Sequence, residues 1–110
     1  MHTVVETPSY LSSAKEEGMT AEEMNLVVEM VAADPACGEL IVGSGGCRKV
    51  RVAGKGKGKS GGYRVVTYFA ATNFPVFLVA VLAKGSRSNF SRAETTAMAK
   101  MAKSVTAGLK

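Results

Sequence analysis

The chain contains no run of about 18 apolar residues, which excludes a transmembrane helix. Its first ten residues, MHTVVETPSY, lack the basic region and the apolar stretch of a signal peptide, so we expect a cytoplasmic protein. Histidine is also scarce, because the single one is His2 at the N-terminal end. These absences exclude the membrane-spanning classes and leave little scope for imidazole chemistry.

Cysteine is scarce as well. Cys37 and Cys47 have nine residues between them, and no second pair follows. A structural zinc site normally needs four Cys or His ligands, so we expect no metal centre. Two free thiols are favoured over a disulfide, although a single disulfide would be possible.

The length of 110 residues fits one domain, residues 1–110, and no internal repeat is visible. Hydrophobic residues make up 46% of the chain, which is enough for a folded protein rather than a disordered one. The core that such a chain can bury is small.

Acidic residues are nearly absent after residue 40. Residues 1–40 hold eight acids and one base, a net charge of −7, whereas residues 41–110 hold thirteen bases and one acid, a net charge of +12. Residues 47–64 contain seven bases and no acid. Such a block repels itself unless a polyanion neutralises it, which favours a nucleic-acid partner. The alternatives are a solvated loop that maintains solubility and a surface for an acidic protein.

Residues 53–60, AGKGKGKS, match the pattern of a phosphate-binding nucleotide loop. In such a loop a helix begins at the final Lys-Ser, and its N-terminus binds phosphate. Here Gly61-Gly62 and a β-prone run follow instead, and two glycines are poor helix starters. The chain also lacks an acidic residue on a later apolar strand to hold magnesium. We therefore interpret the segment as a hairpin connection that carries cations on flexible glycines, without a nucleotide cofactor.

The first 40 residues predict a short edge strand around Val4-Val5, followed by two helices. The first helix covers residues 8–17, and Gly18 can end it in a left-handed conformation. The second begins at Thr20, where Glu23 completes a capping-box pattern, and stops at the Asp-Pro pair after residue 33. Its Met and Val stripe at helical spacing predicts a core-facing side rather than a ligand surface.

The middle of the chain predicts three strands. Between residues 48 and 52 the pattern alternates, so that Lys49 and Arg51 lie on one face and two valines on the other. Residues 63–69 form a β-prone run, and residues 75–82 are apolar on both faces, which is typical of an interior strand. The Thr-Asn pair between these two runs supplies a turn.

A third helix is predicted after Ser91, because Ser91 and Glu94 form another capping-box pattern. Its expected core face consists of Ala93, Ala97, Met98, Met101 and Val105. The order strand, helix, helix, three-stranded meander, helix indicates an α+β fold in which helices cover one face of an antiparallel sheet.

Residues 43–69, GSGGCRKVRVAGKGKGKSGGYRVVTYF, closely resemble the RelE/HigB superfamily of bacterial toxins, specifically its HigB-like branch. Members of that branch carry a G-x-G-G-x-R-K-x-R-V segment, a Lys/Gly loop ending in G-G-x-R, and an aromatic strand. Residues 82–91, LAKGSRSNFS, lie where the family has a strand end, a lysine and a short loop. The first 40 residues match only by their acidic, helical character. The resemblance implies a small curved antiparallel sheet, two N-terminal helices and a C-terminal helix.

The resemblance also implies a function. The best-studied members are toxins of type II toxin–antitoxin systems that enter the ribosomal A site and cut the mRNA there, which inhibits translation. A ribose 2′-oxygen attacks the adjacent phosphate without a metal or cofactor. A cognate antitoxin, often a helix-turn-helix protein encoded in the adjacent gene, blocks the toxin. The implied partners are this antitoxin, the ribosome and mRNA, with no membrane and no nucleotide cofactor.

Matching the family's motif places candidate catalytic residues on the basic strands. RNA cleavage of this kind needs a base for the 2′-hydroxyl, cations for the developing phosphorane charge, and an acid for the leaving 5′-oxygen. Lys49 is the candidate base, because a lysine crowded by cations can lose its proton. Arg51 and Arg64 are candidate phosphate clamps, since arginine stays charged and offers a bidentate fork, and Arg87 is retained in the later loop. For the three strand cations, ordinary solvent-facing or structural roles are the alternative.

Six further residues are expected to bind RNA without reacting: Arg48, Lys55, Lys57, Lys59, Lys84 and Phe90. Phe90 can stack on a base, although a core role fits equally well. Two departures from the family concern the chemistry: Gly85 replaces an arginine of some members, and Ser91 occupies the position of a tyrosine. Tyr68 lies one position past the tyrosine that other members carry on this strand, so the general acid stays unassigned.

Two other functions fit the same basic surface. A non-catalytic module could bind RNA or the ribosome only, and codon-level cleavage in a translation extract separates the two hypotheses. A toxin of the same fold could instead poison a topoisomerase, as members of the ParE branch do. The lysine-rich hairpin argues against this third hypothesis, because that branch lacks such a loop.

Overall fold

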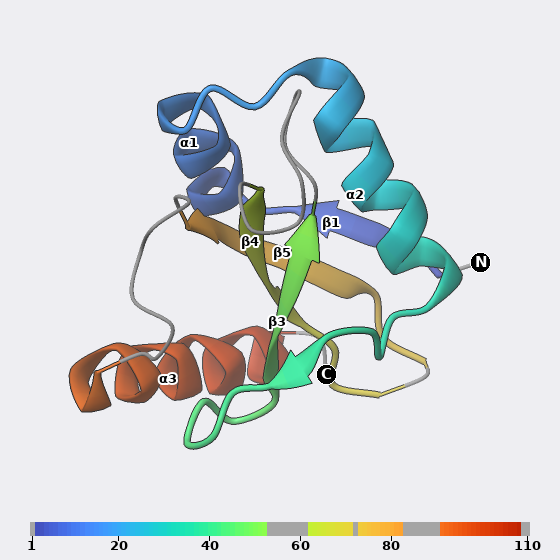
Figure 1. Cartoon of the computed structure of the whole chain (residues 1–110). Coiled ribbons are helices and arrows are strands. Elements are labelled where there is room, and N and C mark those ends of the chain that lie inside the picture. The colour runs from blue at the N-terminus through green and yellow to red at the C-terminus, as the bar shows by residue number, and fades with distance from the viewer. Residues whose placement is uncertain (1, 53–61, 72, 83–90, 109–110) are drawn as a thin grey trace.

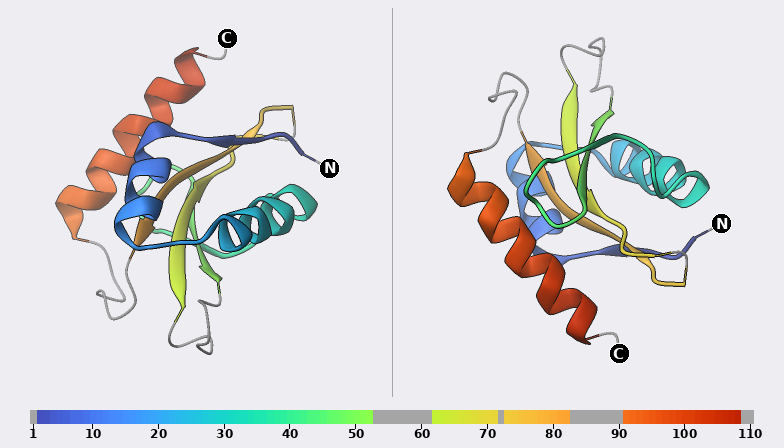
Figure 2. Two further views of the ribbon diagram at one scale, coloured as in Figure 1. Left: turned by 90° about the horizontal axis from the view of Figure 1, so that it is seen from above. Right: turned by 90° about the horizontal axis from the view of Figure 1, so that it is seen from below.

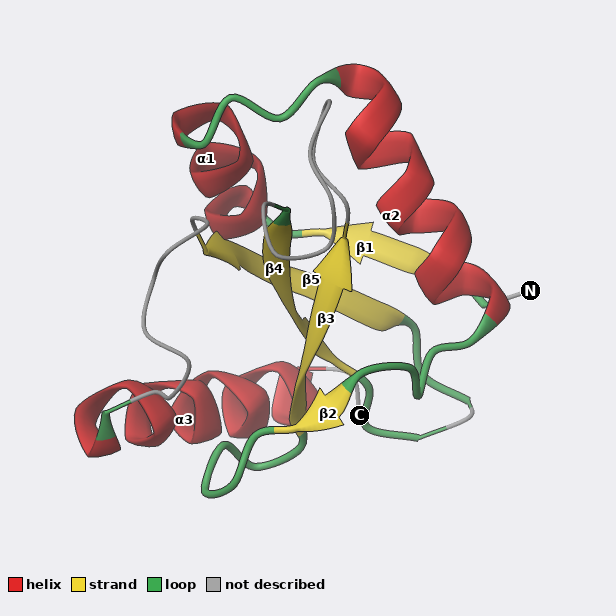
Figure 3. Cartoon of the chain, viewed as in Figure 1, coloured by secondary structure: helices red, strands yellow, loops and turns green. Residues whose placement is uncertain are grey.

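The structure, a computed structural model, describes residues 2–52, 62–71, 73–82 and 91–108. Its elements follow in the order β1 (Val4–Glu6), α1 (Pro8–Glu16), α2 (Ala21–Ala33), β2 (Glu39–Leu40), β3 (Cys47–Val52), β4 (Tyr63–Tyr68), β5 (Val76–Leu82) and α3 (Arg92–Gly108). Figure 3 shows the resulting mixture of helices and strands. The predicted α+β class is therefore confirmed. No helix of the described residues is both long and apolar enough to span a membrane.

The sheet has five strands in the order β1-β5-β4-β3-β2. β2, β3, β4 and β5 pair antiparallel with their neighbours, whereas the edge strand β1 pairs parallel to β5. The expected antiparallel meander is thus present, with a parallel edge strand that makes the sheet mixed. The two-residue strand β2 was not expected, because so short a segment shows no alternation of apolar and polar residues.

Local side-chain chemistry explains where the first two helices begin and end. Thr7 caps α1, and its hydroxyl accepts a hydrogen bond from the Tyr10 N–H. Thr20 and Glu23 form the predicted capping box at α2, with N···O distances of 2.9 and 3.1 Å. Gly18 ends α1 with a φ of 74°, as the sequence predicts.

The helices lie on both faces of the sheet. α1 and α2 cover one face, called the α1/α2 face below, and α3 crosses the opposite one, called the α3 face (Figures 1 and 2). The expectation that the helices cover a single face was therefore wrong. The reason is visible in β4, where Val65 is buried on the α1/α2 face and the adjacent Val66 on the α3 face. A sheet that is apolar on both faces needs a cover on each.

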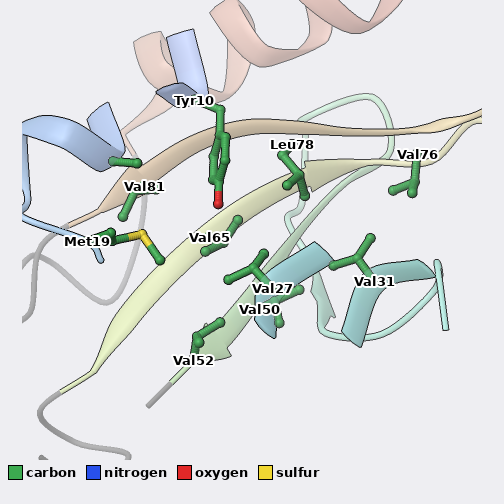
Figure 4. Close-up of a cluster of buried hydrophobic side chains, with 11 residues drawn as sticks. Tyr10, Met19, Val27, Val31, Val50, Val52, Val65, Val76, Leu78 and Val81 are labelled. Carbon is green, nitrogen blue, oxygen red and sulfur yellow. The ribbon is translucent and has the colours of Figure 1, made fainter. Parts of the chain in front are cut away.

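The core on the α1/α2 face is the larger one and is drawn in Figure 4. Its buried residues are Tyr10, Ala14, Met19, Val27, Val31, Val50, Val52, Val65, Val76, Leu78 and Val81. Val27 and Val31 of α2 are both 0% exposed, which confirms that the Met and Val stripe of this helix faces the core. Val50 and Val52 lie in the same core, so the predicted inner face of β3 is also confirmed.

The core on the α3 face is smaller. Its buried residues are Ile41, Cys47, Val66, Tyr68, Phe77 and Ala102. α3 contributes Ala102, with Met98, Met101 and Val105 partly buried beside it, whereas Ala93 and Ala97 are exposed. The expected core face of this helix is therefore confirmed for Met98, Met101 and Val105 and wrong for Ala93 and Ala97. The helix also passes close to Gly45, where an added Cβ would lie 3.2 Å from the Ala99 Cα.

A bulge in β5 reverses which of its side chains face each core. Val79 is the extra residue between two paired positions. Past the bulge, Val81 is buried in the core of the α1/α2 face, and Leu82 packs against the core of the α3 face. Ser13 of α1 ties the bulged segment down, because its Oγ accepts a 2.9 Å hydrogen bond from the Val81 N–H.

Candidate functional site

β3 presents two cations on the α3 face. Cys47 of this strand belongs to the core of the α3 face, and side chains alternate along a strand, so Lys49 and Arg51 follow it on the same face. Val50 and Val52 point to the other side. Lys49 is partly buried and Arg51 is exposed. The predicted split of β3 into an apolar face and a basic face is confirmed.

The pairing of β3 with β4 brings a third cation to this surface. Arg64 of β4 lies directly opposite Arg51, and Lys49 lies opposite the neighbouring position on that face, Val66. Directly opposed residues have Cβ atoms about 5 Å apart, and diagonal neighbours are about 7–8 Å apart. The structure thus brings together Lys49, Arg51 and Arg64, which we call the cation cluster.

A directly opposed pair of arginines is unfavourable in a sheet. Like charges at opposite positions destabilise the pairing of two strands, and Arg51 and Arg64 occupy such positions. An anion between the two guanidinium groups would remove this repulsion and accept a fork of N–H donors from each. The cluster is therefore well suited to bind a phosphate.

The surface beside the cation cluster is apolar. On β5, Ala80 is paired with Val66, and Leu82 is paired with Arg64; both are partly exposed. Tyr68 is only 5% exposed and stacks on Phe77, with ring centroids 6.4 Å apart. This tyrosine is thus part of the core, and its position offers no support for a role as general acid.

Sequence reasoning missed one charged residue at this site. Glu39 of the short strand β2 lies directly opposite Lys49 in the antiparallel pairing, so its carboxylate shares the α3 face with the cation cluster. Its side chain is exposed. The pairing that brings Glu39 to Lys49 joins positions ten residues apart through a loop, and the sequence shows no periodic signal for it.

Arg48 lies on the other face of β3 from the cation cluster. It has the same alternation as Val50 and Val52, and its Nη1 donates a 3.2 Å hydrogen bond to the carbonyl oxygen of Gly38. The structure therefore places Arg48, which the sequence predicts to bind RNA, on the opposite face from Lys49 and Arg51. Its visible contact is structural.

Six of the proposed site residues lie outside the described part of the chain: Lys55, Lys57, Lys59, Lys84, Arg87 and Phe90. Their flanks are described. β3 and β4 pair antiparallel on either side of residues 53–61, so these residues connect a hairpin, as predicted. The element that follows the Lys-Ser pair is the strand β4 rather than a helix, which is incompatible with a phosphate-binding nucleotide loop.

The charges of the remaining elements also divide between the two sides of the sheet. α1 and α2 carry five glutamates in or beside them, at positions 16, 17, 22, 23 and 29. α3 exposes Arg92, Lys100 and Lys103 on the side of the cation cluster. The difference in charge between the two parts of the sequence therefore becomes a difference in charge between the two faces of the sheet. Such a difference turns the basic face toward a polyanion.

The titratable groups with shifted pKa values lie in the cores rather than in the cation cluster. Burial raises the pKa of Tyr10 to about 12, with a smaller contribution from Glu6. Burial also raises the pKa of both cysteines, which are free thiols, as expected. Within the described residues, no group of three or more His, Cys, Asp or Glu side chains could hold a metal ion.

Comparison with known proteins places these features in a family. The model of the family described as RelE toxin of the RelE/RelB toxin–antitoxin system matches residues 3–109. Among solved structures, the chain is similar to the E. coli toxin RelE, determined as a mutant in the free state, with a TM-score of 0.60 and 20% sequence identity. This similarity covers 91% of the present chain and 95% of the E. coli chain.

Proposed function

We propose, from the premise that the chain belongs to the RelE toxin family, that it is a ribosome-dependent endoribonuclease that cuts mRNA in the ribosomal A site. Membership of this family makes it a toxin of a toxin–antitoxin system. The observation that carries the nuclease proposal is the opposed pair of Arg51 and Arg64 with Lys49 diagonal to it. A phosphate bound between the arginines would place its ribose neighbour within reach of the lysine.

The proposed reaction uses no metal ion or cofactor. The ribose 2′-oxygen forms a bond to the adjacent phosphorus while the bond from phosphorus to the 5′-oxygen breaks. The 2′-proton passes to a base, and an acid supplies a proton to the leaving 5′-oxygen. The products are a 2′,3′-cyclic phosphate and a 5′-hydroxyl end.

Each member of the cation cluster has a role in this proposal. Lys49 accepts the 2′-proton, and the two arginines hold the non-bridging oxygens as negative charge develops on them. Arg87, which follows β5 in the sequence and lies outside the described residues, completes the proposed catalytic set. The residue that protonates the 5′-oxygen is left unassigned, since Tyr68 is buried and Ser91 replaces the family's tyrosine.

The proposed partners follow the family. A cognate antitoxin, encoded in the adjacent gene and built on a helix-turn-helix, would block the toxin, and the substrate would be ribosome-bound mRNA in the cytoplasm. Assignment to the HigB-like branch is part of this proposal. It is supported by residues 43–69, which carry both the basic strand and the Lys/Gly loop.

Two measurements test the nuclease. Expression of the chain alone should stop bacterial growth, and Arg64→Ala should relieve the arrest. In single-turnover cleavage of a programmed ribosome, Lys49→Ala and Arg64→Ala should each lower the rate by about 10² or more while ribosome binding is largely retained. Lys15→Ala, an exposed lysine on α1, is the matched control and should leave the rate unchanged.

The opposite outcomes identify the alternatives. Normal growth with an abundant, folded wild-type protein would reject the toxin as an active species. Loss of ribosome binding in parallel with cleavage would move the cation cluster from chemistry to docking and favour the non-catalytic module. Inhibition of a DNA topoisomerase without mRNA cleavage would favour the third function.

The lysines at positions 55, 57 and 59 are proposed to provide affinity through RNA phosphates, together with Lys84, while Phe90 stacks on a base. Replacing the three loop lysines with Gln should weaken ribosome binding and flatten its dependence on salt. Each lost contact to a single strand should reduce the log–log slope by about 0.7. An unchanged slope would show that the loop does not contact the phosphate backbone.

A further inference from the structure

Glu39 is the carboxylate nearest to the cation cluster in the strand pairing. The register of β2 with β3 places it directly opposite Lys49, and directly opposed residues have their Cβ atoms about 5 Å apart on the same face. The other acid on α3's side, Glu94, is engaged at the start of α3, where its Oε1 accepts a hydrogen bond from the Ser91 N–H. Glu39 is therefore placed to act on Lys49.

The backbone holds Glu39 in this register. Gly38 precedes it with a φ of 92°, and a Cβ added there would lie 2.6 Å from the carbonyl oxygen of Lys49. Only glycine allows the two chains to approach so closely. The guanidinium of Arg48 secures the same segment by donating to the Gly38 carbonyl oxygen. The backbones of β2 and β3 are thus held in the register that pairs Glu39 with Lys49.

A negative charge at this position opposes the binding of RNA, because a carboxylate beside a phosphate site lowers the affinity for a polyanion. Glu39 is such a carboxylate, since its exposed side chain lies on the edge strand β2 beside the cation cluster. A benefit to the chemical step would offset this cost. Lysine carries its charge on a flexible four-carbon stem, so a carboxylate opposite it can restrict where the ammonium lies. The register of β2 and β3 puts Glu39 at such a position.

We infer that Glu39 is a positioning residue for Lys49, whose ammonium or amine it holds beside the arginine pair for the proposed cleavage. The inference rests on the proposed function and adds a residue to it. Gly38 and Arg48 serve the same end indirectly, because they keep the edge strand against β3. Glu39 itself does not touch the RNA in this arrangement.

The test separates the rate of cleavage from binding. In single-turnover cleavage of a programmed ribosome, Glu39→Gln should lower the rate about tenfold, while affinity for the ribosome stays equal or rises because a negative charge is removed. Glu39→Asp, which keeps the charge on a shorter side chain, should recover part of the rate. Glu29→Gln, an exposed acid on α2, is the matched control and should change neither quantity.

A double-mutant cycle decides whether Glu39 acts through Lys49. In the Lys49→Ala background, Glu39→Gln should cause no further loss, because the residue that it positions is absent. A full additional loss there would make Glu39 a reacting group and overturn the inference. An unchanged or higher rate in the single variant would overturn it too, since Glu39 would then only repel RNA.

A measurement on the protein without RNA separates this inference from the proposed function. Nuclear magnetic resonance relaxation of the Lys49 Nζ group should show greater disorder in Glu39→Gln than in wild type, with Glu29→Gln as control. A wild-type protein that fails to cleave would reject the nuclease proposal, whereas an unchanged Lys49 order would reject the positioning role.

Discussion

The α1/α2 face and the α3 face of one sheet differ in what they bury and in what they expose. The first is covered by two helices over a continuous apolar core, in which Tyr10, Val65 and Leu78 are fully buried. The second is covered by one helix, and beyond its smaller core it presents Lys49, Arg51 and Arg64. One face therefore carries the larger share of the apolar core, and the other carries the cation cluster.

The charges follow the same division. The acidic helices lie over the face that is already filled, and the basic strands leave their charges on the opposite face. A molecule polarised in this way turns its basic side toward a polyanion during diffusion, and this effect weakens as salt is added. Because most acids lie away from the cation cluster, they reduce its affinity for a polyanion very little. Glu39, at the edge of the cluster, is the exception.

The largest expected effect is on the α1/α2 face. Leu78→Ala removes a fully buried side chain from the core and should lower the free energy of unfolding by about 2–5 kcal/mol. Urea unfolding measures the loss, and the slope with denaturant should stay constant. Val79→Ala, a partly exposed neighbour, is the control. A loss below about 1 kcal/mol would show that this core is less important than the comparison implies.

The second effect appears at alkaline pH. The pKa of Tyr10 is raised to about 12, above its unfolded value, so its stabilising contribution is complete below pH 10 and is lost as the pH rises through about 12. The loss amounts to roughly 2–3 kcal/mol. Tyr10→Phe should lack this loss and be at least as stable at neutral pH, because the phenol oxygen is buried with no hydrogen-bond partner in the described part of the chain.

Thermal unfolding between pH 9 and 12 measures this difference. The pKa of Tyr63 is also raised, by burial and by Glu23 and Glu17, so a smaller alkaline loss should persist in the variant. Equal pH dependence of wild type and Tyr10→Phe would show that the phenol is not as enclosed as the structure indicates.

The smallest effect on stability is expected on the α3 face. Arg51→Gln should leave the free energy of unfolding unchanged or raise it by a few tenths of a kcal/mol, because it removes repulsion from Arg64. The same change should lower cleavage about tenfold or more, since a phosphate clamp is lost. Urea unfolding and single-turnover cleavage of the same sample provide both values. A clear loss of stability would contradict the expectation that the basic residues of the α3 face do not stabilise the fold.

Much of the local structure could be predicted because its causes lie close together in the chain. The capping boxes at Thr20 and Ser91 join residues three apart, and both form. The alternation along β3 put Lys49 and Arg51 on one face with no knowledge of the partner strands. The resemblance of residues 43–69 to a toxin family pointed to the same strands, and the match over residues 3–109 confirms the RelE toxin family.

Two features depended on contacts between residues distant in the sequence: which face of the sheet each helix covers, and which side chains meet at the cation cluster. α3 lies on the opposite face because both faces of β4 are apolar, and it passes close to Gly45. No periodicity in the chain records either fact. The hydrogen bond from Arg48 to the Gly38 carbonyl oxygen likewise joins residues ten positions apart.

The sequence by itself thus determined the class of fold, all the elements except β2, the basic strand and the family, since each depends on short-range patterns or on a contiguous motif. Only the tertiary structure decided that Arg64 lies opposite Arg51 and that Glu39 lies opposite Lys49. The register of strand pairing sets these neighbours, and it depends on the packing of both cores and on the loops between the strands. Chemistry that needs two side chains about 5 Å apart is therefore specified at that level.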